Sequence, residues 1–196
     1  EGHAADVLAT IDQIEVESLH VVGLSMGGYI ALALAEIAPE RLSSLVLADT
    51  RSTPDDEVGR DGRNNTIQSI TDGEAAEVVG GMVDKLVTGS APEQIRELII
   101  TMGLAIPEET LIADLGAMRD RPDRTAVLED LDCPILVVVG AEDALTPPAD
   151  AEAMAAAAGA GARYEVIPAA GHMAPLEKPL DFAEVLTGFL RDVEGT

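Results

Sequence analysis

Aromatic residues are almost absent from this sequence. Its 196 residues include two Phe, two Tyr and no Trp, although apolar residues make up 47% of the chain. The core must therefore be built mainly from Ala, Val, Leu and Ile. A chain of this length and composition is typical of one globular domain with a sizeable aliphatic core.

Cysteine is equally scarce, since Cys133 is the only one. One thiol cannot form a disulfide within the chain, and no group of Cys and His residues has the spacing of a metal site. We therefore expect no metal centre, and we expect an intracellular, cytoplasmic protein.

Long apolar runs are missing as well. The runs LHVVGL and PILVVVG have the length of a strand, whereas a membrane span needs roughly 20 residues. The first residues, EGHAADVLATIDQ, lack the basic segment and following apolar segment of an export signal. The sequence thus predicts neither a membrane span nor an export signal.

Positive charge is the fourth scarcity. The chain has 12 Lys and Arg against 36 Asp and Glu, a formal net charge of -24. Such a surface repels phosphate backbones and anionic membranes, so we expect neither nucleic acid nor a membrane as partner. Solubility, or adaptation to high salt, explains the acidity, which says nothing about the reaction.

Buried strands alternate with helices at the start of the chain. Apolar residues recur every three or four positions from Ala4 to Ile14, which predicts a helix. The continuous apolar run Leu19 to Leu24 predicts a strand buried on both faces. The helix YIALALAEIA and a second buried strand, LSSLVLADT, follow it. Strand, helix and strand over about 30 residues form a βαβ unit, which predicts a parallel sheet.

The middle of the chain differs from its two ends. Residues 54–130 contain helical stretches around 74–87, 92–103 and 108–119 and no convincing strand, which indicates a mostly helical insertion. The buried-strand pattern returns in CPILVVVGAEDALTPP, followed by an Ala-rich helix, a short strand and an amphipathic closing helix. We therefore expect an α/β fold whose core comprises residues 1–53 and 131–196, with 54–130 as a helical cap.

The segment GLSMGG, residues 23–28, fits the pattern G-x-S-x-G with Ser25 at its centre. A strand that turns sharply into a helix strains its apex residue, and the neighbours two positions away, Gly23 and Gly27, must lack bulk. The apex hydroxyl then projects above the sheet near the N-terminus of a helix, where developing negative charge is stabilised. Ser25 is therefore the candidate nucleophile.

A serine hydroxyl needs a base, and the chain has three histidines. His3 lies in the opening helix and His20 begins a buried strand, so both are better explained as structural or solvated residues. His172 lies in AAGHMAPLEKP, a loop beyond the last strand, from which it can reach the carboxyl edge of the sheet. His172 is therefore the candidate base.

A carboxylate after a strand can hold the imidazole in the right tautomer. Asp143, in VVVGAEDALTP, has that placement, whereas strand alternation points the adjacent Glu142 elsewhere. Asp49, after the strand SSLVLAD, also ends at the top edge of the sheet and is the alternative acid. The order Ser, Asp, His matches that of α/β-hydrolases.

At these residues the chain resembles the α/β-hydrolase superfamily, especially 3-oxoadipate enol-lactonases and cofactor-free haloperoxidase-type esterases. The resemblance rests on VVGLSMGGYIALALAEIAPERLSSLVLADT, CPILVVVGAEDALTPP and IPAAGHMAPLEKPLDFAEVLTGFL. It implies a helical cap, no metal and no organic cofactor. It also implies that the backbone N-H of Met26, directly after the nucleophile, stabilises the oxyanion.

The chain departs from the family's pattern at its front. Members begin with several strands and a loop that gives the second oxyanion N-H, and none of these is recognisable here. The chain is then a fragment, a subunit completed by a partner chain, or a reduced fold whose copies pair. Since the missing strands would lie beside Leu19–Leu24, we expect an exposed apolar edge that self-associates or binds a complementary chain.

Three functional hypotheses follow. The first is hydrolysis of a small carboxylic ester or lactone through an acyl-enzyme, with an aliphatic pocket. Met82, Met102 or Met118 could line that pocket, although core packing explains each of them better. The second keeps the same three residues but uses peroxide in place of water, as a perhydrolase or haloperoxidase does. The third is a non-catalytic binding module with the same fold.

Overall fold

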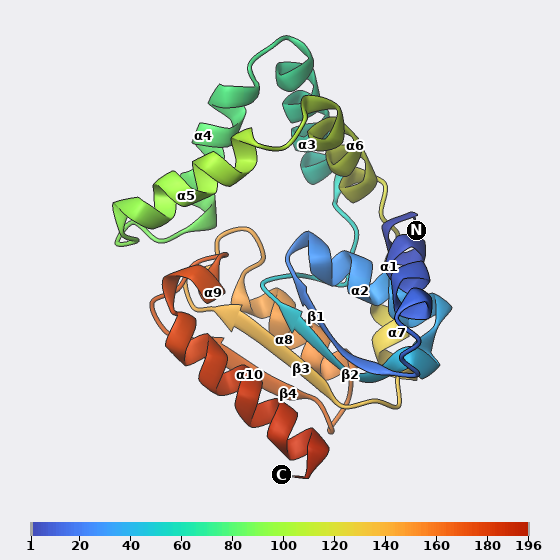
Figure 1. Ribbon diagram of the computed structural model, residues 1–196. Helices are drawn as coiled ribbons and strands as arrows, with labels where there is room; N and C mark the ends of the chain where they lie inside the picture. Colours follow the sequence, from blue (N-terminus) through green and yellow to red (C-terminus); the bar gives the residue numbers. More distant parts are fainter. Residues whose placement is uncertain (1, 196) are drawn as a thin grey trace.

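The computed structural model describes residues 2–195 and shows a parallel sheet between helices, with a further group of helices above it (Figure 1). The strands are β1 (Leu19–Leu24), β2 (Leu42–Ala48), β3 (Ile135–Gly140) and β4 (Arg163–Ile167). The helices around the sheet are α1 (Gly2–Gln13), α2 (Met26–Ile37), α7 (Thr125–Asp130), α8 (Pro148–Ala157), α9 (Ala174–Glu177) and α10 (Pro179–Glu194), with a 3-10 helix, η1 (Pro39–Arg41). The upper group comprises α3 (Glu57–Thr71), α4 (Ala75–Leu86), α5 (Glu93–Leu104) and α6 (Glu108–Arg119).

The sheet is fully parallel, with strand order β1-β2-β3-β4. The βαβ pattern of the sequence predicted this arrangement, and the prediction is confirmed. Because all strands run the same way, their carboxyl ends meet at one edge of the sheet. Ser25, Asp49 and the loop with Asp143 follow β1, β2 and β3 at that edge, so the fold gathers residues that are far apart in sequence.

Alternate residues of each strand enter two different cores. In β2, Leu45 and Leu47 pack with α2 and α8 on one face, whereas Val46 and Ala48 pack with α10 on the other. All four side chains are fully buried. Burying a Leu or Val stabilises the fold by about 1.5–3 kcal/mol relative to leaving it exposed, so an apolar run without polar interruption is what a doubly covered strand requires.

β1 lies at one edge of this sheet. Within residues 2–195 it pairs with one strand, β2. The side chain of Val22 is 46% exposed, in contrast to the buried interior of β2 and β3. The expected apolar edge at Leu19–Leu24 is thus present in this structure.

The upper helices α3–α6, referred to below as the cap, lie within the predicted helical insertion and have a small core around Val83, Val87 and Ile99. Three of the four cap helices match the stretches expected from the sequence, and α3 is additional. α7 also falls within residues 54–130, but its Leu128 is fully buried in the core that the sheet forms with α2 and α8. The cap layer therefore ends at α6. None of the helices in the described part of the chain is long and apolar enough to cross a membrane.

Candidate active site

Ser25 lies at the sharp turn between β1 and α2. Its backbone has φ 51° and ψ -116°, a left-handed φ that costs a non-glycine residue roughly 1–3 kcal/mol. Two contacts from the end of β2 hold it there: the Ser25 N-H donates to the Ala48 carbonyl at 2.9 Å, and the Thr50 hydroxyl donates to the Ser25 carbonyl at 2.7 Å. This strained turn presents the hydroxyl above the sheet, as the motif predicted.

Two glycines make this turn possible. A Cβ added to Gly23 would lie 2.5 Å from the Gly27 carbonyl oxygen, and one added to Gly28 would lie 2.5 Å from side-chain atoms of Thr50. A Cβ on Gly27 would meet nothing within 4 Å. The expectation that Gly27 must lack bulk is therefore wrong, because the second crowded position is Gly28, which packs on Thr50 just after β2.

Ser25, His172 and Asp143 form one chain of hydrogen bonds. The Nε2 atom of His172 lies 2.7 Å from the Ser25 Oγ, and its Nδ1 lies 2.9 Å from Oδ2 of Asp143. Both His172 and Asp143 are 3% exposed. The three residues singled out in the sequence thus meet, with the imidazole between the hydroxyl and the carboxylate, in the arrangement that activates a serine.

Asp143 is held by donors from its own loop. Its Oδ1 accepts the N-H groups of Leu145 and Thr146 at 2.8 and 3.0 Å, and its Oδ2 accepts the Thr146 hydroxyl at 2.7 Å. Burial acts to raise the pKa of Asp143, but the hydrogen bond and charge of His172 and the donors of Thr146 outweigh it and hold the pKa below its ordinary value. Asp143 therefore stays ionised beside the imidazole. Thr146 was not predicted from the sequence, although a Thr in the same loop as an acid can be recognised as a local hydrogen-bond partner.

Asp49, the alternative acid, is differently placed. It lies directly after β2, is 1% exposed, and accepts the Gly140 N-H at 2.8 Å. Among the described residues it makes no hydrogen bond to His172, which is bonded to Asp143 instead. Burial is the main cause that raises the pKa of Asp49 to about 8. A carboxyl that is neutral at pH 7 and out of contact with the imidazole does not fit the role of the acid.

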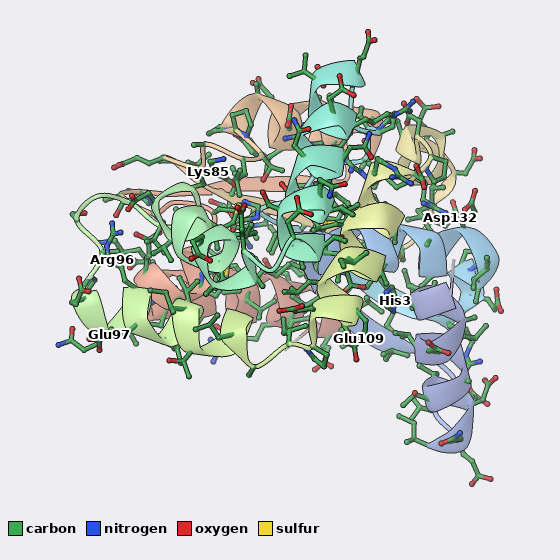
Figure 2. All side chains as sticks on the ribbon, turned by 90° about the horizontal axis from the view of Figure 1, so that it is seen from above. His3, Lys85, Arg96, Glu97, Glu109 and Asp132 are labelled. Carbon is green, nitrogen blue, oxygen red and sulfur yellow. The ribbon has the colours of Figure 1, made fainter. Side chains whose placement is uncertain are left out.

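The other two histidines lie outside this site. The view from above shows His3 beside the cap, where its Nε2 is 3.0 Å from Oδ1 of Asp114 in α6 (Figure 2). His20 contacts the Ser44 hydroxyl at 2.8 Å through Nδ1. Both therefore make structural contacts, and His172 is the histidine that reaches Ser25.

Met26 is the first residue of α2. The first N-H groups of a helix have no acceptor in a preceding turn, and the helix dipole favours negative charge there. The Met26 N-H follows Ser25 directly, which is where an oxyanion forms when the hydroxyl attacks a carbonyl. The position of Met26 is thus suited to the role that the resemblance implies for it.

A cavity of about 560 Å³ lies beneath the cap, next to the residue that follows Ser25. Met26 and Leu145 line it from the core, and Asp55 and residues of α3–α6 line the rest. Met82 and Met118 are among them, whereas Met102 is 54% exposed and does not line the cavity. Two of the three methionines suggested as lining residues therefore line the cavity, which is mostly apolar with a few charged groups.

The charged lining of this cavity is partly neutralised. The carboxylate of Asp55 forms ion pairs with the guanidinium groups of Arg63 and Arg121, each with an N to O distance of 2.9 Å. Burial acts to raise the pKa of Asp55, but the two guanidinium groups outweigh it and lower that pKa. Arg121 also stacks 4.2 Å from the ring centroid of Tyr29 in α2. These contacts link the start of the cap to the helix that follows Ser25. Within residues 2–195 no group of three or more His, Cys, Asp or Glu is arranged to hold a metal ion.

Comparison with known proteins gives the same family. The sequence model described as the alpha/beta hydrolase family matches residues 2–185. The chain belongs to this family. Its structure is similar to that of a thermophilic esterase from Thermogutta terrifontis, with a TM-score of 0.92 and 34% identity, covering 97% of this chain and 71% of that one. The predicted fold and family are thereby confirmed.

Two curated relatives illustrate the range within the family. The chain is 28% identical over 191 residues to a protein named putative non-heme bromoperoxidase BpoC from Mycobacterium tuberculosis, covering 89% of this chain and 69% of that protein. It is 25% identical over 194 residues to 3-oxoadipate enol-lactonase 1 from Acinetobacter baylyi, covering 96% and 70%. This member of the alpha/beta hydrolase family therefore spans about 70% of the length of each of these relatives.

Proposed function

We propose that the chain is a serine hydrolase that cleaves small carboxylic esters or lactones through an acyl-enzyme. The observation that carries this proposal is the 2.7 Å contact between Ser25 Oγ and His172 Nε2, with Asp143 on the other ring nitrogen. The family membership and the similarity to an esterase at 34% identity support the same reaction class.

The first half of the reaction forms the acyl-enzyme. His172 Nε2 takes the Ser25 proton while Oγ attacks the carbonyl carbon of the ester. The carbonyl oxygen becomes an oxyanion that the Met26 N-H stabilises, and Asp143 stabilises the imidazolium. The intermediate then collapses, the bond to the alcohol oxygen breaks, and His172 returns its proton to that oxygen.

The second half regenerates the enzyme. A water molecule enters, His172 takes one of its protons, and the remaining hydroxide attacks the acyl carbon. The bond to Ser25 Oγ breaks, Oγ regains a proton from His172, and the carboxylic acid leaves. In a lactone the alcohol and the acid are parts of one molecule, so the product is a hydroxy acid.

The cavity beneath the cap indicates the kind of substrate. Its volume of about 560 Å³ suits a small molecule, and its lining is predominantly aliphatic. Met82 and Met118 provide flexible apolar contacts. We therefore propose that the acyl group is short and aliphatic.

Turnover of p-nitrophenyl acetate and butyrate tests the proposal, with Ser25→Ala as the matched control. The wild-type chain is expected to release p-nitrophenol at least a hundredfold faster than the variant, because only the wild type can form the acyl-enzyme. Equal rates would refute it and favour a non-catalytic module. Formation of a peracid when hydrogen peroxide is added would support the perhydrolase alternative instead.

A further inference from the structure

Asp49 is a buried acid that the reaction just described does not use. It directly follows β2, and its backbone has a left-handed φ of 45°, which is unfavourable for a residue other than glycine. Its side chain accepts the Gly140 N-H through Oδ1 at 2.8 Å. Its other oxygen, Oδ2, is buried and has no hydrogen-bond partner within residues 2–195. A buried charge with an unpartnered oxygen is costly, so this carboxyl is expected to hold a proton.

The position of Asp49 relates it to both partners of Ser25. Gly140, which it contacts, ends β3 three residues before Asp143. The backbone amide of Ala174, which begins α9 two residues after His172, lies near the same carboxyl without forming a hydrogen bond to it. Asp49 thus lies where the segments that carry the acid and the base converge.

The charged groups that face Asp49 are of one sign. Asp143, from the loop after β3, and Glu177, from α9, both act on it as negative charges. No Lys, Arg or His forms an ion pair with it in the described part of the chain. His172 forms its ion pair with Asp143. Ionisation of Asp49 would therefore add a further negative charge to a buried site that offers it no counter-charge.

We propose that Asp49 is a positioning residue that acts as a protonated carboxyl, and that its ionisation displaces the segments carrying Asp143 and His172. This inference rests on the proposed function, because its effect on rate passes through those two residues. Burial, the main cause, raises the pKa of Asp49 from 3.8 to about 8, which places the change at mildly alkaline pH.

The pH profile of kcat tests this inference in three variants. Asp49→Asn keeps an acceptor for the Gly140 N-H and cannot ionise, whereas Asp49→Ala removes the acceptor. Glu142→Gln removes an exposed carboxylate from the Asp143 loop and is the matched control. We expect wild type and Glu142→Gln to lose at least tenfold in kcat between pH 7.5 and 9.5, and Asp49→Asn to lose less than twofold.

The alanine variant separates positioning from ionisation. Because it leaves the Gly140 N-H without a partner, Asp49→Ala is expected to have a kcat at least tenfold lower than Asp49→Asn at every pH. Wild-type and Asp49→Asn profiles that coincide above pH 7.5 would overturn the inference. So would equal activity of the Asn and Ala variants.

Two further readouts do not depend on catalysis. The folded pKa of Asp49 is higher than the unfolded one, so the stability of wild type relative to Asp49→Asn should be greatest below pH 4, fall as pH rises through 8, and then stay constant. Urea unfolding at pH 4, 6, 8 and 9.5 measures this, and parallel curves would overturn the inference. These curves retain their meaning even if Ser25→Ala shows that the chain has no esterase activity.

Carbon-13 NMR of the wild-type chain covers the case in which the variants do not fold. With aspartate labelled at the side-chain carboxyl carbon, one signal is expected to titrate with a midpoint near pH 8. Carboxyl signals that all titrate below pH 6 would overturn the inference.

Discussion

Glu177 joins the cap to the loop that carries His172. One oxygen of its carboxylate accepts both the backbone N-H and the hydroxyl of Thr88, at 2.9 and 2.6 Å, and the other accepts the Gly171 N-H at 2.7 Å. Thr88 lies between cap helices α4 and α5, and Gly171 immediately precedes His172. This side chain thus helps to fix the cap and the base relative to each other.

Replacing Glu177 should therefore destabilise the contact between the cap and the loop that carries His172. Glu177→Ala leaves three donors without their acceptor, and hydrogen bonds to charged groups contribute about 1.5–3 kcal/mol each. We expect the free energy of unfolding to fall by about 3 kcal/mol or more, as measured by urea denaturation. Thr88→Val, which removes one of the three donors, should lower it by about 1 kcal/mol. Equal losses in the two variants would contradict the role of Glu177 as a shared acceptor.

Gly27 and Gly28 are neighbours in α2, but only Gly28 lacks space for a side chain. Because a Cβ at Gly28 would lie 2.5 Å from Thr50 and one at Gly27 would meet nothing within 4 Å, Gly28→Ala is expected to reduce esterase activity at least a hundredfold. Gly27→Ala, one position away in the same helix, should retain activity within about threefold, since Ala is favoured over Gly in helices. Activity assays and unfolding curves of the two variants check this. The reverse ranking would show that the turn is not built as described.

The acid can be identified by comparing two carboxylates. Asp143→Asn leaves the shape of the loop but removes the charge that holds the His172 tautomer, and the equivalent change in a well-studied protease lowers kcat about 10⁴-fold. We expect a loss of about 10³- to 10⁴-fold at pH 7. Asp49→Asn should have a much smaller effect at the same pH, because the Asp49 carboxyl is neutral there. A larger loss in Asp49→Asn would instead make Asp49 the acid.

The exposed edge at β1 leads to a prediction about assembly. Its outer side has no strand partner within residues 2–195, and Val22 is 46% exposed. We propose that two copies pair along this edge, since unpaired strand edges readily bind further strands. Light scattering after size exclusion at micromolar concentration should give twice the chain mass, and Val22→Lys should shift the chain toward monomer. A wild-type chain that is strictly monomeric would contradict this prediction.

Much of the fold could be predicted from the sequence because its strands are continuous apolar runs. Continuous runs such as Leu19–Leu24, and the βαβ spacing, indicate a buried parallel sheet without reference to other contacts. α3 was not expected, because Gly59, Gly62 and a pair of Asn interrupt its pattern. In the structure the Asp56 side chain caps α3 by accepting the Gly59 N-H at 2.8 Å, and packing against α6 further stabilises the helix.

In the candidate site, too, some residues could be predicted from local sequence and others could not. Ser25 and His172 could be found from local motifs, since each lies in a Gly-containing turn after a predicted strand. The sequence favoured Asp143 over Asp49 but could not settle the choice in this way, because both follow strands at the same edge. The structure distinguishes them, because the His172 ring contacts Asp143 whereas Asp49 accepts the Gly140 N-H instead.

Labelling with a fluorophosphonate tests most directly whether Ser25 is an activated nucleophile. The wild-type chain should take up about one equivalent, with the adduct on Ser25 by peptide mass spectrometry. His172→Ala should react at least a hundredfold more slowly, whereas His3→Ala, which alters a half-exposed histidine beside the cap, should react at the wild-type rate. Absence of an adduct on Ser25, or equal labelling of wild type and His172→Ala, would contradict the account.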